Sequence, residues 1–136
     1  MQVSPHLHFN GDCEAALKFY EQTLGARITF MMPFEGSPAA GEVPETWQSK
    51  ILHASIKIGD NMVTAADAPP GYFHKPQGFS LTIGTQDSIA ADRLFKALSQ
   101  GGSVQMPMQE TFWAARFGML TDRFAIPWMI NCPKSV

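Results

Sequence analysis

Residues 6–26 read HLHFNGDCEAALKFYEQTLGA, and this stretch predicts a strand, a turn and a helix. Polar and apolar residues alternate over 3–9, as in a strand with one buried face. Asn10-Gly11 favours a turn, and Asp12 is a residue type preferred at a helix N-cap. Apolar residues then recur at helical spacing as far as Gly25, which is typical of a helix C-cap.

The same pattern returns in the second half of the chain. The segment SLTIGTQ at 80–86 corresponds to HLHFNGD at 6–12, and the helical residues that follow stay in phase to within one residue. Each half predicts a strand, a helix and three further strands, with a Pro- and Gly-rich connection between the halves. We therefore predict one α+β domain over 1–136, made of module one at 1–67, a linker at 68–78 and module two at 79–136.

The composition narrows the class of protein. Of the 136 residues 45% are hydrophobic and 16% are charged, whereas soluble proteins average about 25% charged residues. This shortage of charge suggests surface hidden against a partner or around a ligand. A net charge of −2 without a basic run argues against nucleic acid and against an anionic membrane surface. With no recognisable signal or membrane-spanning segment, Cys13 and Cys132 are expected to be reduced core residues of a cytoplasmic protein.

Strand alternation predicts a polar set of side chains opposite the helices. In the first strand Leu7 and Phe9 should pack under the helix, which turns His6 and His8 to the other face. His53, in the strand expected at 51–59, should share that face. The corresponding positions of the second half are Ser80, Thr82, Met129 and Asn131. Taken singly, each histidine is better explained as a hydrogen-bonded structural group, but three on one face point equally to a small-ligand site.

The segment QETFWAAR at 109–116 is the most distinctive of the second half. Gln109, Trp113 and Arg116 are expected to line or cap the mouth of a ligand cavity. Glu110 suits either a solvated strand end, a salt bridge or a general base. Structural roles are expected for three later residues, namely a bulge or close backbone approach at Gly118, turn formation at Asp122 and packing at Trp128.

The segments HFNGDCEAALKFYEQTLGA and QETFWAARFGMLTDRFAIPWMIN, together with the repeat, resemble the PhnB-like branch of the vicinal oxygen chelate superfamily. That superfamily also holds glyoxalase I, bleomycin resistance proteins and extradiol dioxygenases. The resemblance covers nearly the whole chain. It implies an incompletely closed mixed β-barrel around a cavity, helices on the outside and a homodimer. Some members are labelled demethylubiquinone methyltransferases, but no Gly-rich nucleotide loop follows the first strand, so methyl transfer from S-adenosylmethionine is not expected.

The resemblance also implies where a metal would bind in metal-dependent members. Their ligands come from the first, fourth, fifth and eighth strands. The matching positions here are His6, a fourth-strand position near 64–66 with Asp67 just beyond it, Ser80 and Met129. A hydroxyl and a thioether are poor ligands for a divalent cation. We therefore expect the usual metal site to be absent, although a divalent metal on His6 with His53 and Asp67 remains an alternative.

Three functions follow as hypotheses. The first is a metal-free homodimer that binds a small organic ligand in its barrel cavity. The second is an enzyme on a small oxygenated metabolite, either metal-dependent (a lyase, isomerase or dioxygenase) or using His6, His8 and Glu110 as acid and base. The third is a dimeric interaction protein with a vestigial cavity. The substrate cannot be read from the fold.

Overall fold

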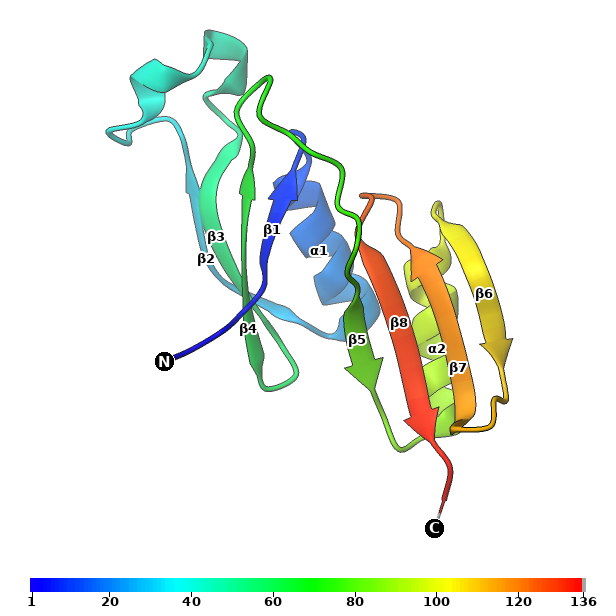
Figure 1. Ribbon diagram of the computed structural model, residues 1–136. Helices are drawn as coiled ribbons and strands as arrows, with labels where there is room; N and C mark the ends of the chain where they lie inside the picture. The colour runs from blue at the N-terminus through cyan, green and yellow to red at the C-terminus, as the bar shows by residue number, and fades with distance from the viewer. Residues whose placement is uncertain (136) are drawn as a thin grey trace. The chain divides into compact units, whose positions relative to one another are not determined.

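The computed structural model describes residues 1–135 and divides the chain into two units, Met1–His74 and Lys75–Val136, so the last residue of module two lies outside the described residues (Figure 1). Unit 1 contains β1 (His6–Phe9), α1 (Cys13–Leu24), β2 (Arg27–Pro33), β3 (Ile51–Ile58) and β4 (Asn61–Asp67). Unit 2 contains β5 (Leu81–Gly84), α2 (Ser88–Ser99), β6 (Ser103–Gln109), β7 (Ala114–Thr121) and β8 (Pro127–Pro133). The expected order of strand, helix and three strands is confirmed in both halves.

The two units have the same sheet topology. Sheet 1 has the strand order β1-β4-β3-β2 and sheet 2 the order β5-β8-β7-β6. β1 runs parallel to β4 in sheet 1, and β5 runs parallel to β8 in sheet 2. All other neighbouring strands are antiparallel. The α+β class with two mixed four-stranded sheets is therefore confirmed, and within residues 1–135 backbone hydrogen bonds do not close the sheets into one continuous barrel.

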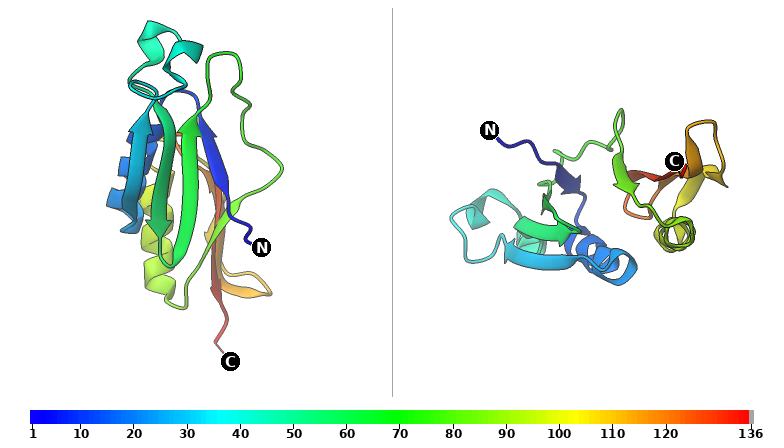
Figure 2. Two further views of the ribbon diagram at one scale, coloured as in Figure 1. Left: turned by 90° about the vertical axis from the view of Figure 1, so that its left-hand side faces the viewer. Right: turned by 90° about the horizontal axis from the view of Figure 1, so that it is seen from below.

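In each unit the helix covers one face of its own sheet, and the opposite face carries no helix of that unit (Figures 1 and 2). We call this second side the helix-free face. In unit 1, α1 packs on β2, β3 and β4, and its apolar stripe is buried together with Leu7 and Phe9 of β1. Burying each such large side chain contributes about 1.5–3 kcal/mol. Gly25 ends α1 in the left-handed conformation, as expected, and its N–H reaches the Tyr20 carbonyl.

The N-terminus of α1 is held differently from the expectation. Asp12 occupies the N-cap position, but its side chain makes no capping hydrogen bond. The buried carboxylate of Asp67, at the end of β4, takes that role: Oδ1 accepts the N–H groups of Gly11 and Cys13 at 2.9 Å each. Its Oδ2 accepts the Ile51 N–H at 2.8 Å. One side chain thus ties β4 to the β1–α1 turn and to the start of β3.

Unit 2 follows the sequence expectations more closely. The sequence predicts the N-cap of α2 at Asp87 or Ser88, and Asp87 takes this role, because its Oδ1 accepts the N–H groups of Ile89 and Ala90 at 2.9 and 3.2 Å. Gly118 on β7 lies under the helix, where an added Cβ would be 2.7 Å from Cε2 of Phe95, which confirms a close approach.

Asp122 organises the turn between β7 and β8, as expected. Its Oδ1 accepts the N–H groups of Phe124 and Ile126, at 2.8 and 3.1 Å. Its Oδ2 accepts the indole N–H of Trp128 at 2.8 Å. Trp128 is only 2% exposed, so its expected packing role is also confirmed.

Two expectations about local structure need correction. The first strand begins at His6 rather than at Val3, because pairing with β4 starts at the His6–Thr64 register. The Pro and Gly content of residues 33–50 predicts a long loop between β2 and β3, but this connection contains two 3₁₀ turns (Ala40–Glu42 and Glu45–Trp47). The side-chain amide of Gln48 fastens this segment by donating to the carbonyls of Ala40 and Val43. None of the described helices has the length and apolar character needed to cross a membrane.

Candidate functional site

The helix-free face of sheet 1 gathers side chains from all four strands. Strand register pairs His6 with Thr64, Thr64 with Ser55, and Ser55 with Phe30. Two residues further along the strands, on the same face, the register pairs His8 with Ala66 and His53 with Met32. Side chains that alternate with these along the strands, including Leu7, Phe9, Ala54 and Ile56, are buried in the core of unit 1.

Three imidazole rings lie together on this face. The rings of His6 and His8 are 4.8 Å apart in an edge-to-face arrangement, and those of His6 and His53 are stacked at 6.2 Å. Phe30 extends the cluster, with its ring 6.0 Å from that of His53. Nδ1 of His6 and Oγ1 of Thr64 share a hydrogen bond of 2.6 Å, which fixes the orientation of the His6 ring. We call His6, His8, His53, Thr64 and Phe30 the histidine cluster.

The electrostatics of the cluster favour a neutral His6 ring. The pKa of His6 lies below its ordinary value, first because the ring is partly buried and then because His8 and His53 are close. A proton on one imidazole disfavours a proton on the next. At neutral pH His6 is therefore a neutral ring with one N–H donor and one nitrogen acceptor, suited to hydrogen-bonding a polar ligand.

The residues implied as metal ligands do not fit a divalent-metal centre. Nδ1 of His6 is engaged by Thr64, and both oxygens of Asp67 accept backbone N–H groups. Over residues 1–135 no group of three or more His, Cys, Asp or Glu side chains is arranged to hold a metal ion. The thiols of Cys13 and Cys132 are buried and free, and burial strongly raises the pKa of Cys13.

Sheet 2 brings most of the second-half residues to its own helix-free face. Thr82 lies beside Met129, and Met129 beside Met119. In the next row Asn131 lies between Gly84 and Phe117, and Phe117 is paired with Gln109. The Trp113 ring contacts the Phe117 ring at 5.2 Å, and Ser80 directly precedes β5.

Arg116 and Glu110 lie apart from this row. Arg116 is turned toward α2, where its Nε is 2.9 Å from the Asp92 carboxylate, and it also donates to the Met108 carbonyl. Glu110 is exposed, with its carboxylate 3.6 Å from Nζ of Lys134. The structure therefore gathers Thr82, Gln109, Trp113, Met129 and Asn131 on one face of unit 2, but not Arg116.

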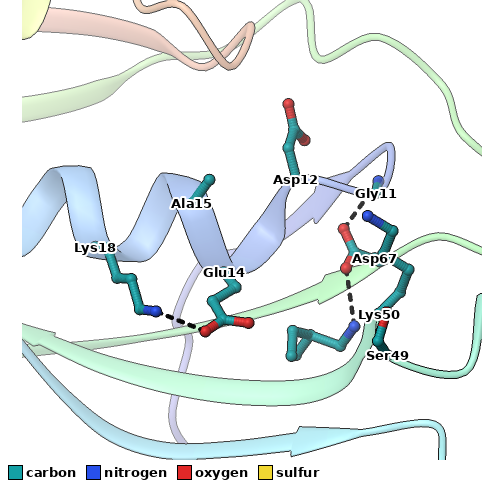
Figure 3. A pocket seen from close by; sticks show the side chains of 9 residues that line it. Gly11, Asp12, Glu14, Ala15, Lys18, Ser49, Lys50 and Asp67 are labelled. Carbon is teal, nitrogen blue, oxygen red and sulfur yellow. Dashed lines mark hydrogen bonds and ion pairs between the residues drawn. The ribbon is translucent and has the colours of Figure 1, made fainter.

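A cleft of about 410 Å³ opens on the helix side of unit 1, between the β1–α1 turn and the start of β3 (Figure 3). The sequence pattern did not predict this cleft, although one of its lining residues, Asp67, was among the expected site residues. It is lined by Gly11, Asp12, Glu14, Ala15, Lys18, Ser49, Lys50, Ile51 and Asp67. Its carboxylates are largely satisfied: Glu14 pairs with Lys18 at 2.7 Å, and Asp67 accepts backbone N–H groups. Figure 3 shows the Asp12 carboxylate turned away from Asp67.

Comparison with solved structures identifies the fold class. The "glyoxylase/bleomycin resistance protein/dioxygenase domain" of Frankia sp. EAN1pec superposes with a TM-score of 0.69 at 15% identity, covering 98% of each chain. A PhnB protein from Bacillus cereus gives 0.82 at 20% identity, covering 97% of this chain and 99% of that one. The two-module fold is that of the vicinal oxygen chelate superfamily.

Sequence comparison identifies the family. Residues 1–131 match the family described as 3-demethylubiquinone-9 3-methyltransferase, and the chain belongs to this PhnB-like family. Protein YjdN of Escherichia coli is 35% identical over 145 residues, covering 98% of this chain and 97% of YjdN. The crystal structure of PA1353 from Pseudomonas aeruginosa is 43% identical, with a TM-score of 0.89 and 99% of each chain covered. The resemblance inferred from the sequence is confirmed.

Proposed function

We propose that this protein binds a small organic ligand at the histidine cluster of unit 1, without the metal site of its metal-dependent relatives. One observation carries the proposal: three imidazoles, a hydroxyl and an exposed phenyl ring converge on a sheet face that the core of unit 1 does not use. Core packing gives no reason to place such residues there, whereas a few convergent polar groups beside apolar surface are typical of ligand sites.

The chemistry of the cluster indicates the kind of ligand. A neutral His6 ring can donate one hydrogen bond and accept another. The exposed side chains of Phe30 and Met32, 46% and 39% accessible, add apolar surface beside the rings. A compact molecule with neighbouring oxygen atoms and a small apolar part matches this arrangement.

The family description names a methyltransferase, and the β1–α1 turn speaks against a nucleotide-type cofactor there. In nucleotide sites the N–H groups of such a turn face phosphate oxygens. Here the N–H groups of Gly11 and Cys13 are donated to Asp67. This bonding argues against a phosphate-bearing cofactor at the turn, and the lack of a Gly-rich loop after β1 argues against S-adenosylmethionine, so the proposal is ligand binding rather than methyl transfer.

The test is a screen of oxygenated fragments by NMR of the imidazole ring protons and carbons. A ligand of the cluster should shift the His6, His8 and His53 resonances and leave His74, which lies in the connection between the units, unchanged. His53→Ala and His6→Ala should each weaken binding about tenfold, and His74→Ala should not. The proposal fails if no fragment shifts the cluster, or if bound fragments keep their affinity in both variants.

The alternative function is an enzyme, metal-dependent or acid–base. The lowered pKa of His6 supports an enzyme, since a neutral imidazole can serve as a metal ligand or as a general base. Elemental analysis of the purified protein, followed by titration with Mn²⁺, Ni²⁺ and Zn²⁺, separates the two. One bound metal per chain that is lost in His6→Ala would refute the metal-free proposal; thermal stability that no divalent cation raises would refute the metalloenzyme.

We also propose that the chain forms a homodimer and works in the cytoplasm. The low charged fraction and the exposed apolar side chains outside the histidine cluster, among them Met62 and Phe112, support a self-association surface. The two free thiols support a reducing compartment.

A further inference from the structure

We infer that unit 2 carries a second subsite, in which the Asn131 carboxamide and the Trp113 ring hold a planar ligand group that bears an N–H or O–H donor. This inference rests on the proposed function, because it describes part of the same ligand-binding activity. It starts from one unusual atom. The side-chain oxygen Oδ1 of Asn131 is shielded from water and has no hydrogen-bond partner among the described residues.

An unpartnered amide oxygen is costly in a folded protein, and a leucine or isoleucine would suit this strand position better. The other side chains of β8 show how apolar the strand is. Trp128, Ile130 and Cys132 are buried toward α2, and Met129 shares the helix-free face with Asn131. A polar side chain kept at such a position without a partner in the protein points to a partner from outside.

The surroundings of Asn131 leave room on one side and provide an aromatic wall on the other. On β5 its register partner is Gly84, and no atom of the described chain lies within 4 Å of a Cβ built there. On β7 its partner is Phe117, whose ring packs edge-to-face with Trp113 at 5.2 Å. Asn131 itself is half-buried, so its side chain is open to the helix-free face between these two neighbours.

Trp113 supplies the second contact. Its side chain remains 48% exposed, although its ring touches Phe117 on one side and Phe112, at 4.8 Å, on another. These neighbours orient the indole and leave ring surface free for stacking. A carbonyl acceptor beside a fixed aromatic surface selects flat groups with a hydrogen-bond donor, such as a phenol, an indole or a primary amide.

Three matched pairs of probes test this chemistry, each a donor and its methylated counterpart: indole and 1-methylindole, phenol and anisole, benzamide and N,N-dimethylbenzamide. Binding is followed through the Trp113 indole N–H and the Asn131 side-chain N–H₂ in ¹H–¹⁵N spectra. At least one donor should shift both signals with about fivefold or greater preference over its methylated partner. Equal affinity within every pair, or no shift with any probe, would overturn the inference.

Two variants locate the site. Asn131→Leu should abolish the preference for the donor, because the acceptor is gone. Gly84→Val should block binding by filling the open space, and it leaves Asn131 and Trp113 in place. If Asn131→Leu does not fold, Gly84→Val decides alone: wild-type affinity for the donor probe in that variant contradicts the subsite.

The histidine ring resonances, recorded in the same samples, separate this inference from the proposed function. Fragments that bind at His6 and His53 while every donor probe fails at Asn131 would refute the second subsite only. Donor probes that bind at Asn131 while no fragment reaches the histidine cluster would refute the proposed function only.

Discussion

Asp67 shows how one side chain replaces the cap that local sequence predicts. Its two oxygens accept three backbone N–H groups, whereas Asp12 at the N-cap accepts none for α1. We predict that Asp67→Asn lowers the free energy of unfolding by about 1–3 kcal/mol, since the new N–H₂ group faces a donor. Asp12→Asn should have little effect, because the Asp12 side chain makes no capping hydrogen bond to α1. Urea unfolding of the two variants makes the comparison, and equal stability would contradict it.

The lowered pKa of His6 gives a pH dependence whose sign can be stated. Below a pH of about 6.5 the unfolded chain binds a proton at this histidine before the folded chain does. The free energy of unfolding should therefore fall as the pH drops below about 6.5, until the folded-state pKa is passed. Urea titrations at pH 7.5 and 5.0 should show a smaller loss in His6→Gln than in wild type. His74→Gln is the control and should keep the wild-type loss; an unchanged loss in His6→Gln would refute the assignment.

At the scale of elements, the packing of α2 on β7 depends on the missing side chain of Gly118. An added Cβ would lie 2.7 Å from Cε2 of Phe95 and 2.6 Å from Sδ of Met108. We predict that Gly118→Ala lowers the free energy of unfolding by about 1–3 kcal/mol through overpacking. Gly84→Ala is the matched control, because this strand glycine has open space around it. Thermal unfolding should give a higher Tm for Gly84→Ala than for Gly118→Ala. The reverse order would contradict the prediction, because it would mean that α2 can shift to accommodate the added methyl group.

For the whole molecule, the prediction concerns self-association. Only 16% of the residues are charged, and the described residues include exposed apolar side chains such as Met62 and Phe112. Size-exclusion chromatography with light scattering should give twice the chain mass of 15.0 kDa at micromolar concentration. A monomer under these conditions would contradict the homodimer and leave the charge shortage to be explained by the ligand faces alone.

Local sequence patterns were enough to predict the repeated strand–helix–strand order, a cap at Asp87 or Ser88, the turn at Asp122 and the face shared by His6, His8 and His53. These features follow from periodicities of two and 3.6 residues and from turn chemistry, which act over a few neighbours. Three further features became known from the folded chain: Asp67 holds the start of α1, Arg116 pairs with Asp92, and Asn131 lies between Gly84 and Phe117. Those contacts join residues that are distant in the chain, and their partners are set by strand register and helix packing, which no local pattern encodes.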